Sequence, residues 1–219
     1  MNEMTNNPSE RGVLSLVLGV DGSGKSTFLQ GLQNRFGAKI LEPTSTPEVR
    51  AFKKANLNTP IDSDFVDRRE QLFLNLNRRF DGDVNSLLRQ DKDVATTGNG
   101  LVTLISHALM RIVVGEKPSL EIDRAINTWL EGDMLKPDHI TLVHAPDKVI
   151  MERIQDRQKQ GNELERFWGF NAPYFLSRYQ DTWLQATNTI TQNSGIPTLQ
   201  LDSSQLQTMT MLDAYEQQQ

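Results

Sequence analysis

Short apolar runs alternate with longer amphipathic stretches along this chain, and the alternation predicts strands and helices in turn. Buried strands are predicted at residues 13–18, 38–41, 93–97, 139–144 and 197–201. Helices are predicted at residues 25–36, 47–55, 63–88, 101–114, 120–130, 148–160 and 175–192, with one more at the C-terminus. Strands that alternate with helices indicate an α/β fold with a mainly parallel sheet of about five strands flanked by helices. Ligands of such sheets bind at the carboxyl ends of the strands.

Domain organisation follows from the lack of repeats and linkers in the sequence. Residues 1–11 are polar and have no apolar core, so we expect a flexible tail rather than a secretory signal. No internal repeat or long linker interrupts residues 12–219, which are expected to form a single domain. Inside it, Gly37 is expected to end the helix before it, and Gly82 to break the helix at 63–88.

Composition and charge exclude several classes of function. The 219 residues carry a net charge of -5, and an acidic chain argues against nucleic acid as a partner. Cysteine is absent, which excludes disulfides, thiolate nucleophiles and Cys-ligated zinc. His107, His139 and His144 show no metal-ligand spacing and are expected to be structural. The apolar run at residues 13–20 is too short to cross a bilayer, so we expect a cytoplasmic protein without a membrane partner.

The run Gly-Val-Asp-Gly-Ser-Gly-Lys-Ser at residues 19–26 satisfies the phosphate-binding template G-x-x-x-x-G-K-[ST]. It follows a predicted strand and opens a predicted helix, so backbone N–H groups and the positive helix end can hold phosphates there. Lys25 is expected to reach the β- and γ-phosphates of ATP as a catalytic residue, and the Ser26 hydroxyl to bind Mg²⁺. The residues predicted to contact the ATP phosphates are Gly22, Ser23, Gly24, Lys25, Ser26 and Thr27.

Asp21 places a carboxylate inside a loop that otherwise suits anions. One interpretation makes Asp21 catalytic, facing an acceptor hydroxyl or the Mg²⁺ shell. The alternative is a turn-stabilising aspartate that accepts hydrogen bonds from its own backbone. The sequence favours the first interpretation, because the rest of the loop is suited to phosphate chemistry.

The form Gly-x-Asp-Gly-Ser-Gly-Lys-Ser-Thr at residues 19–27 resembles thymidylate kinases and their nucleoside monophosphate kinase relatives. Shorter matches follow in the right order, so the resemblance covers about residues 13–214. They lie at residues 42–47, 70–78, 137–142, 152–157, 162–167 and 201–204. The resemblance implies a P-loop kinase fold and an enzyme that uses ATP and Mg²⁺ to phosphorylate a nucleoside monophosphate, most readily a dTMP-like one. It also implies a homodimer, for which the apolar residues 101–114 are a candidate interface.

Acceptor contacts follow from the same resemblance. Arg50 corresponds to the arginine after the family's Glu-Pro segment, and Arg78 to the helix arginine that contacts the acceptor, with a surface position as its alternative. Thr103 falls near the family's polar contact to the base, and Thr97 stands where a side chain can hold a Mg²⁺-bound water. Phe73 is a candidate to stack on the base, with a core position as its alternative.

A basic lid is predicted from arginines in and after the sixth predicted helix. Arg153 and Arg157 are four residues apart and share one helix face, and Arg166 follows after a loop. Arginines on a mobile segment suit closure over phosphates, with Gly161 as the hinge. We therefore predict a lid at about residues 157–167 and a catalytic role for these three arginines. The alternative is an ordinary solvated helix, since acidic residues are interleaved.

The third predicted strand departs from the family's pattern. Family members end this strand with Asp-Arg-Tyr or Asp-Arg-His, whose arginine grips the acceptor phosphate, whereas residues 95–100 here read Ala-Thr-Thr-Gly-Asn-Gly. The loss of a guanidinium clamp removes a strong and geometrically specific phosphate contact. Two alternatives therefore stand beside the nucleoside monophosphate kinase. One is a kinase for another acceptor, such as a nucleoside, a modified nucleotide or a small metabolite. The other is an ATP-binding paralogue without catalysis.

Overall fold

One parallel sheet carries the fold of this computed structural model, which describes residues 11–42, 46–56, 62–115, 118–160 and 172–218. Its strands are β1 (Leu14–Leu18), β2 (Lys39–Leu41), β3 (Val94–Thr96), β4 (His139–His144) and β5 (Thr198–Asp202). The helices of the described residues are α1 (Lys25–Phe36), α2 (Pro47–Ala55), α3 (Ser63–Leu88), α4 (Gly100–Val113), α5 (Pro118–Glu131), α6 (Asp147–Lys159), α7 (Ala172–Ser194) and α8 (Thr208–Glu216).

β1 lies at the centre of the sheet. The strand order is β2-β3-β1-β4-β5, and every neighbouring pair is parallel. A parallel sheet is covered by helices on both faces, so its central strand needs side chains that tolerate burial on both sides. Every residue of β1 is buried, as this requires. The predicted five-stranded parallel α/β fold is confirmed.

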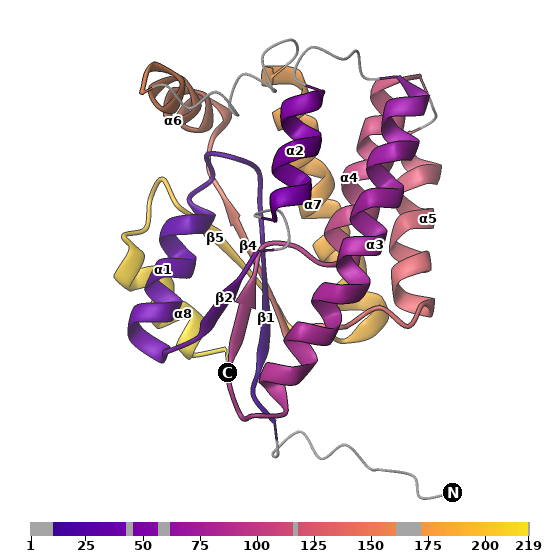
Figure 1. Cartoon of the computed structure of the whole chain (residues 1–219). Helices are drawn as coiled ribbons and strands as arrows, with labels where there is room; N and C mark the ends of the chain where they lie inside the picture. Colours follow the sequence, from indigo (N-terminus) through magenta and orange to yellow (C-terminus); the bar gives the residue numbers. More distant parts are fainter. Residues whose placement is uncertain (1–10, 43–45, 57–61, 116–117, 161–171, 219) are drawn as a thin grey trace, which may run out of the picture.

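The helices form two layers around the sheet. Figure 1 shows α1 and α8 together on one face, and α3, α4, α5 and α7 on the other. The larger core joins β1 and β4 to α4, α5 and α7, and contains the fully buried Trp129 and Trp183. The second core lies under α1 and α8, where Phe28 and Tyr215 meet edge to face. Among the described helices, none is long and apolar enough to cross a membrane.

The predicted break of α3 at Gly82 is wrong, because the helix runs unbroken through this residue. A glycine inside a helix costs about 0.5–1 kcal/mol relative to alanine. Beyond it, however, Val84 and Leu88 are buried in a cluster with residues of β1 and β3. Packing therefore outweighs the local preference of glycine. Gly37, by contrast, ends α1 as predicted, with a left-handed φ of 71°.

Candidate active site

The phosphate-binding loop leaves the carboxyl end of β1 and enters α1 at Lys25. Gly19, Gly22 and Gly24 have φ angles of 140°, 85° and 102°, a region that residues with side chains rarely adopt. A Cβ atom at Gly19 would lie 2.2 Å from the carbonyl oxygen of Val143, so only glycine fits there. The three glycines thus set the curl of the loop.

Two features of the loop fit an anionic ligand. Ser23 is fully buried, and its Oγ has no hydrogen-bond partner among the described residues. Gly24 caps α1 without a side-chain hydrogen bond, so no capping side chain occupies the first N–H groups at the positive end of the helix. Buried polar atoms are normally paired. An orphaned hydroxyl beside an uncapped helix start therefore fits the oxygens of a triphosphate.

Lys25 and Asp21 carry the charges of the loop. The Lys25 ammonium donates to the carbonyl oxygens of Gly19 and Val20, each at 2.8 Å, and lies 3.9 Å from an Asp21 carboxylate oxygen. The Lys25 side chain is 16% exposed, against 45% for Asp21. Within the described residues no backbone N–H donates to the Asp21 carboxylate, which is open to solvent. The arrangement leaves both charged groups within reach of a ligand on the loop.

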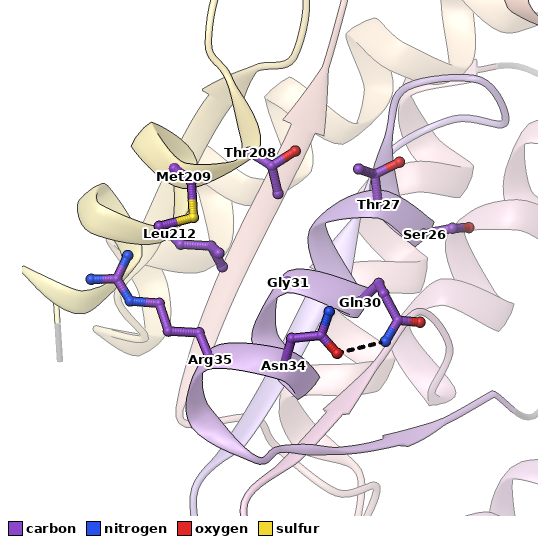
Figure 2. Close-up of a pocket in the computed structure, with 9 residues that line it drawn as sticks. All are labelled: Ser26, Thr27, Gln30, Gly31, Asn34, Arg35, Thr208, Met209 and Leu212. Atoms are coloured by element: carbon purple, nitrogen blue, oxygen red, sulfur yellow. Dashed lines mark hydrogen bonds between the residues drawn. The ribbon is translucent and has the colours of Figure 1, made fainter.

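Ser26 and Thr27 begin α1 with exposed side chains beside an open groove of about 650 Å³ between α1 and α8 (Figure 2). α8 supplies the facing wall through Thr208, Met209 and Leu212. The described residues contain no group of three His, Cys, Asp or Glu side chains that could hold a metal ion. A Mg²⁺ ion here would depend on the Ser26 hydroxyl, phosphate oxygens and water, a ligand set that suits this ion beside nucleotides.

Arg153 of α6 fastens the loop to the segment after β5. Its Nη1 donates to the carbonyl oxygen of Gly22 and to Ser203 Oγ, each at 3.0 Å. Its Nη2 donates to the Ser203 carbonyl oxygen at 3.3 Å, and Ser203 Oγ donates to the Ser23 carbonyl oxygen at 2.5 Å. We call these contacts of Arg153 and Ser203 the loop brace. The sequence predicted a site role for Arg153 and a family match at residues 201–204, but not the contact of Arg153 with Ser203, because no local pattern joins residues so far apart.

The other predicted charged residues are more scattered. Arg157 lies one turn after Arg153 on α6 and is partly buried. Arg166, with the predicted lid from residue 161 onward, lies outside the described residues. Arg50 on α2 and Arg78 on α3 are exposed. The structure therefore does not bring Arg78 into the helix interface described next, and its role stays a prediction.

A polar cluster between α3 and α4 contains two of the predicted acceptor residues. Phe73 and Thr103 are buried, with 5% and 4% of their surface exposed. Asn77 donates from Nδ2 to Thr103 Oγ1 at 2.6 Å, and the Phe73 ring meets the His107 ring edge-on at a centroid distance of 6.2 Å. The Arg69 guanidinium lies 4.5 Å from the Phe73 ring centroid and donates to His107 Nε2 at 2.8 Å. We call these five residues the α3–α4 cluster. Thr97, the remaining predicted acceptor contact, follows β3 and is partly buried.

Burial shifts the proton affinities of this region. Burial, reinforced by the charge of Arg69, lowers the pKa of His107 to about 2, so the imidazole is neutral at pH 7. Burial also lowers the pKa of Arg69 to about 10, which leaves the guanidinium charged at neutral pH. On α7, burial raises the pKa of Tyr179, whose hydroxyl shares a hydrogen bond of 2.5 Å with Ser106 Oγ. The region thus combines one cation with neutral polar groups.

Comparison with known proteins finds matches among solved structures. No protein-family model matches the chain, and no curated protein matches it. Thymidylate kinase from Candida albicans superposes with a TM-score of 0.66 at 18% identity, over 94% of this chain and 92% of that chain. Deoxyadenosine kinase from M. mycoides, with the products dCMP and dCDP bound, gives a TM-score of 0.69 at 13% identity, over 93% and 97%. The chain has the P-loop kinase fold.

Within this P-loop kinase fold, Arg69, Asn77 and His107 lie in the α3–α4 cluster although the sequence predicted no site role for them. A signal for them exists in the spacing. Arg69, Phe73 and Asn77 recur every four residues along α3, and Thr103 and His107 do so along α4. The pattern of one helix does not show which of its faces meets which face of another. The pairing therefore becomes visible only in three dimensions.

Proposed function

We propose that this protein is a kinase that uses ATP and Mg²⁺ to phosphorylate a nucleoside monophosphate, with a dTMP-like acceptor favoured. One observation carries the proposal: the glycine-curled loop at the carboxyl end of β1, with Lys25 and Ser26 opening α1, lies inside a P-loop kinase fold. Ligands of parallel α/β sheets bind at this end. Residues 12–219 would act as one catalytic domain, and the homodimer that the family resemblance implies belongs to the same proposal.

The loop residues would act through charge and position, which is what phosphoryl transfer mainly requires. Lys25 would exchange its two carbonyl partners for phosphate oxygens and neutralise the charge that develops on them. The acceptor oxygen attacks the γ-phosphorus in line while the bond to the β–γ bridging oxygen breaks, so ADP leaves and no covalent enzyme intermediate forms. Asp21 would face the acceptor with its exposed carboxylate. Arg157 and Arg166 would close over the phosphates.

The α3–α4 cluster supports a nucleotide as the acceptor. A buried aromatic ring flanked by a few polar groups is a common binding surface for a nucleobase, because the ring stacks and the polar groups read the base edge. Phe73 supplies the ring, and Asn77 with Thr103 supplies hydrogen-bonding groups. Further acceptor contacts are proposed for Arg50, Arg78 and Thr97.

A second candidate is a kinase for an unphosphorylated acceptor, such as a nucleoside. Residues 97–99 stand where the family resemblance places the Asp-Arg pair of thymidylate kinases, and Gly98 is buried with its N–H donating to Thr96 Oγ1 at 3.1 Å. The fold also matches a deoxyadenosine kinase. A kinase for a modified nucleotide or a small metabolite would also be consistent with the missing Asp-Arg pair. An ATP-binding paralogue without catalysis is the remaining alternative.

Release of ADP from the purified protein, supplied with ATP and Mg²⁺, tests these candidates against a panel of nucleoside monophosphates and nucleosides. Stimulation by dTMP or dUMP, and not by their nucleosides, supports the proposal. Stimulation by a nucleoside supports the second candidate, and tight ATP binding without acceptor-stimulated turnover supports the non-catalytic alternative.

Replacement of Lys25 by alanine tests where the phosphates bind. Lys25→Ala removes the cation of the loop and is expected to lower kcat by about 100-fold or more. Lys92→Ala, at an exposed lysine that donates to Gln90, is the matched control and is expected to leave kcat unchanged. Full activity in Lys25→Ala would show that the phosphate site is placed wrongly.

A further inference from the structure

The peptide that joins Ser23 to Gly24 belongs to the phosphate-binding loop and is free to rotate as far as its own residues are concerned. Such a rotation changes ψ of Ser23 and φ of Gly24, which is 102° here, and glycine populates φ of either sign about equally. Because the peptide is trans, the N–H of Gly24 points away from the carbonyl oxygen of Ser23. Any group that holds this carbonyl therefore also decides where the N–H points.

Ser203, in the turn after β5, holds this carbonyl through its side chain. Its Oγ donates to the Ser23 carbonyl oxygen at 2.5 Å and accepts from Arg153 Nη1 at 3.0 Å. A guanidinium can only donate hydrogen bonds, so Arg153 occupies a lone pair of the hydroxyl and leaves its single proton for Ser23. The same Nη1 donates to the Gly22 carbonyl oxygen at 3.0 Å. One pair of side chains thus fixes two neighbouring carbonyls of the loop.

The backbone of Ser203 is fixed from behind. Its N–H donates to the carbonyl oxygen of His144, at the end of β4, at 2.9 Å. Its carbonyl oxygen accepts from Arg153 Nη2 at 3.3 Å. The turn also packs closely on the loop, because a Cβ atom at Gly24 would lie 3.1 Å from Ser203 Cβ. The Ser203 hydroxyl therefore has a defined place beside the loop.

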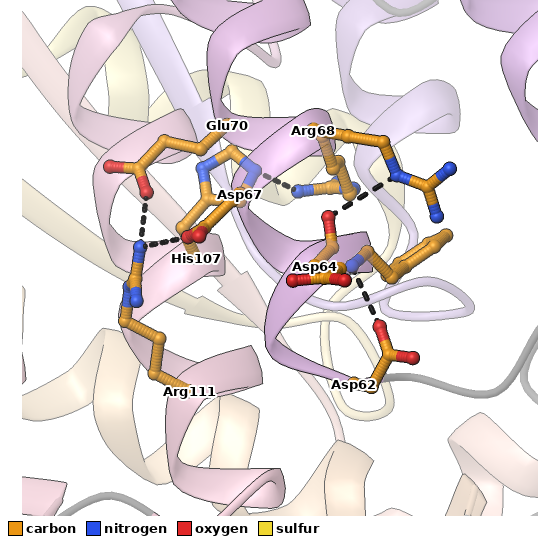
Figure 3. Close-up of polar contacts among 9 residues, drawn as sticks. Asp62, Asp64, Asp67, Arg68, Glu70, His107 and Arg111 are labelled. Carbon is orange, nitrogen blue, oxygen red and sulfur yellow. Dashed lines mark hydrogen bonds and ion pairs between the residues drawn. The ribbon is translucent and has the colours of Figure 1, made fainter.

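Arg111, between α3 and α4, shows the other way in which this fold holds a guanidinium. It forms ion pairs with Asp67 and Glu70 of α3, each at 2.8 Å (Figure 3). Arg153 instead donates to two carbonyl oxygens and a hydroxyl, and no carboxylate of the described residues lies at ion-pair distance from it. A carboxylate at this place would repel phosphates on the loop. Neutral partners fix the loop without adding negative charge.

We propose that Ser203 and Arg153 are positioning residues of the phosphate-binding loop, which keep the Gly24 N–H turned toward the phosphates. The inference rests on the proposed function, because it explains how the loop is held ready for its ligand. The N–H lies on the side of the peptide opposite Ser203, at the start of α1, where Lys25 enters the helix. Arg153, for which the sequence predicted a catalytic role, acts through the loop instead of contacting the phosphates.

Tripolyphosphate with Mg²⁺ probes the loop alone, because it carries the phosphates without a nucleoside. Titration calorimetry of the full chain is expected to show that Ser203→Ala weakens its binding by about 10-fold, the effect of one misdirected hydrogen bond to a charged group. Ser203→Thr keeps the hydroxyl and is expected to retain the wild-type affinity. The matched control is Ser194→Ala, because Ser194 Oγ also donates to a carbonyl oxygen, that of Ile190, but within α7. This control is expected to bind tripolyphosphate like the wild type.

Variants of Arg153 separate geometry from charge. Arg153→Met removes the donors to Ser203 and Gly22 and is expected to weaken tripolyphosphate binding by about 10-fold or more. Arg153→Lys keeps the positive charge but lacks the rigid fork of donors, so it is expected to bind as weakly as Arg153→Met. Arg111→Met removes a guanidinium held by carboxylates and is expected to leave the affinity unchanged. Full affinity in Arg153→Lys would show that charge alone matters and would overturn the proposal.

The double variant tests whether the two residues act on the same peptide. In the Arg153→Met background, Ser203→Ala is expected to weaken binding by less than about 2-fold more, because the hydroxyl has already lost the partner that directs it. Two effects that multiply would mean that Arg153 contacts the phosphates directly. That result would overturn the assignment of Arg153.

The amide proton resonance of Gly24 separates positioning from a merely structural role. Saturating tripolyphosphate is expected to move this resonance downfield in the wild type and much less in Ser203→Ala. A merely structural serine would lower the melting temperature and leave the shift of Gly24 on binding unchanged, which would overturn the proposal. Arg153→Lys supplies the same measurement if Ser203→Ala does not fold.

Binding measured without an acceptor keeps this test apart from the proposed function. Tripolyphosphate binding that depends on Ser203, in a protein that transfers no phosphoryl group, would refute the kinase activity and retain the positioning role. Phosphoryl transfer at limiting ATP that is equally fast in the wild type and in Ser203→Ala would retain the kinase and overturn the positioning role.

Discussion

Among the described residues, three cations of the candidate site donate hydrogen bonds to neutral acceptors. Lys25 donates to the Gly19 and Val20 carbonyl oxygens and lies 3.9 Å from an Asp21 oxygen. Arg153 donates to the Gly22 carbonyl oxygen and to Ser203, and Arg69 donates to an imidazole. Carboxylates accept from cations away from the site, namely Arg11, Arg35 and Arg111. A cation on neutral atoms keeps more of its attraction for an incoming phosphate or oxo group.

Buried neutral histidine makes folding stability depend on pH. The pKa of His107 falls to about 2 on folding, so below its ordinary value of 6.5 the unfolded chain binds a proton that the folded chain does not. The stability that His107 contributes is therefore present above pH 6.5 and is lost as the pH falls. His107→Gln does not titrate, so from pH 6.5 to 5.5 the wild type should lose about 1 kcal/mol more free energy of unfolding than the variant. Urea unfolding at the two pH values measures this, and parallel losses would contradict it.

The geometry of the glycine-rich loop could be predicted from the sequence, whereas the packing of the predicted acceptor residues could not. Residues 19–24 form one continuous loop that runs directly into α1 at Lys25, so the spacing of glycine, lysine and serine already contains the geometry. Phe73 and Thr103 lie buried between α3 and α4, whereas Arg78 is exposed, and the acceptor role of all three stays a prediction. Which face of α3 is buried depends on how α3 packs against α4, and that contact lies outside any local pattern.

At the scale of elements, α3 serves two layers of the molecule at once. Its C-terminal half buries Val84 and Leu88 against strand residues, whereas its N-terminal half presents Arg69 and Phe73 to α4. Gly82 lies in the C-terminal half, just before Val84, in an exposed position with no atom within 4 Å of a Cβ built there. Packing on either side holds the helix through this residue.

Gly82→Ala is expected to raise the free energy of unfolding by about 0.5–1 kcal/mol, because alanine restricts the unfolded chain and meets nothing in the folded one. Gly31→Ala in α1 is the contrasting variant, since its Cβ would lie 2.9 Å from Leu212 Cδ1 of α8. Gly31→Ala should raise the free energy of unfolding less than Gly82→Ala does, or lower it. Urea unfolding followed by tryptophan fluorescence measures both, and a loss in Gly82→Ala would mean that the helix is strained there.

Most elements could be predicted to within a few residues, because their apolar runs are short and bounded by glycine, proline or polar residues. The predicted helix break at Gly82 was wrong. Helix propensity depends on the residue itself, whereas the packing of Val84 and Leu88 depends on residues far away in the sequence. The strand order β2-β3-β1-β4-β5 could not be predicted from the pattern alone, since apolar runs do not reveal which strands become neighbours.

At the scale of the whole molecule, the first and last elements meet. β1 lies between β3 and β4, β5 adds to β4, and Tyr215 of α8 shares a hydrogen bond of 2.5 Å with Ser15 of β1. The phosphate-binding loop therefore extends from the central strand of the sheet, every residue of which is buried. A ligand that binds this loop is coupled to unfolding of the entire fold.

Saturation with ATP and Mg²⁺ is expected to stabilise the whole molecule. At 100 times its Kd, a ligand of the folded state adds about 2.7 kcal/mol to the free energy of unfolding, which for a chain of this size raises Tm by about 5–10 °C. Fluorescence of the fully buried Trp129 and Trp183 reports the transition. Lys25→Ala should lose most of the shift, and an equal shift in this variant would argue against the loop as the ATP site.

The loop brace also sets an order of assembly. The loop at residues 19–24 is synthesised early, but Ser203, which ties Arg153 to the Ser23 carbonyl, follows the last strand of the sheet. A nascent chain has the glycine spacing of the loop long before it has the hydrogen bonds that fix the loop's outer carbonyls. On the proposed function, the ability to bind ATP would therefore be acquired at the end of folding. Incomplete or partly unfolded copies of the protein would then bind little ATP.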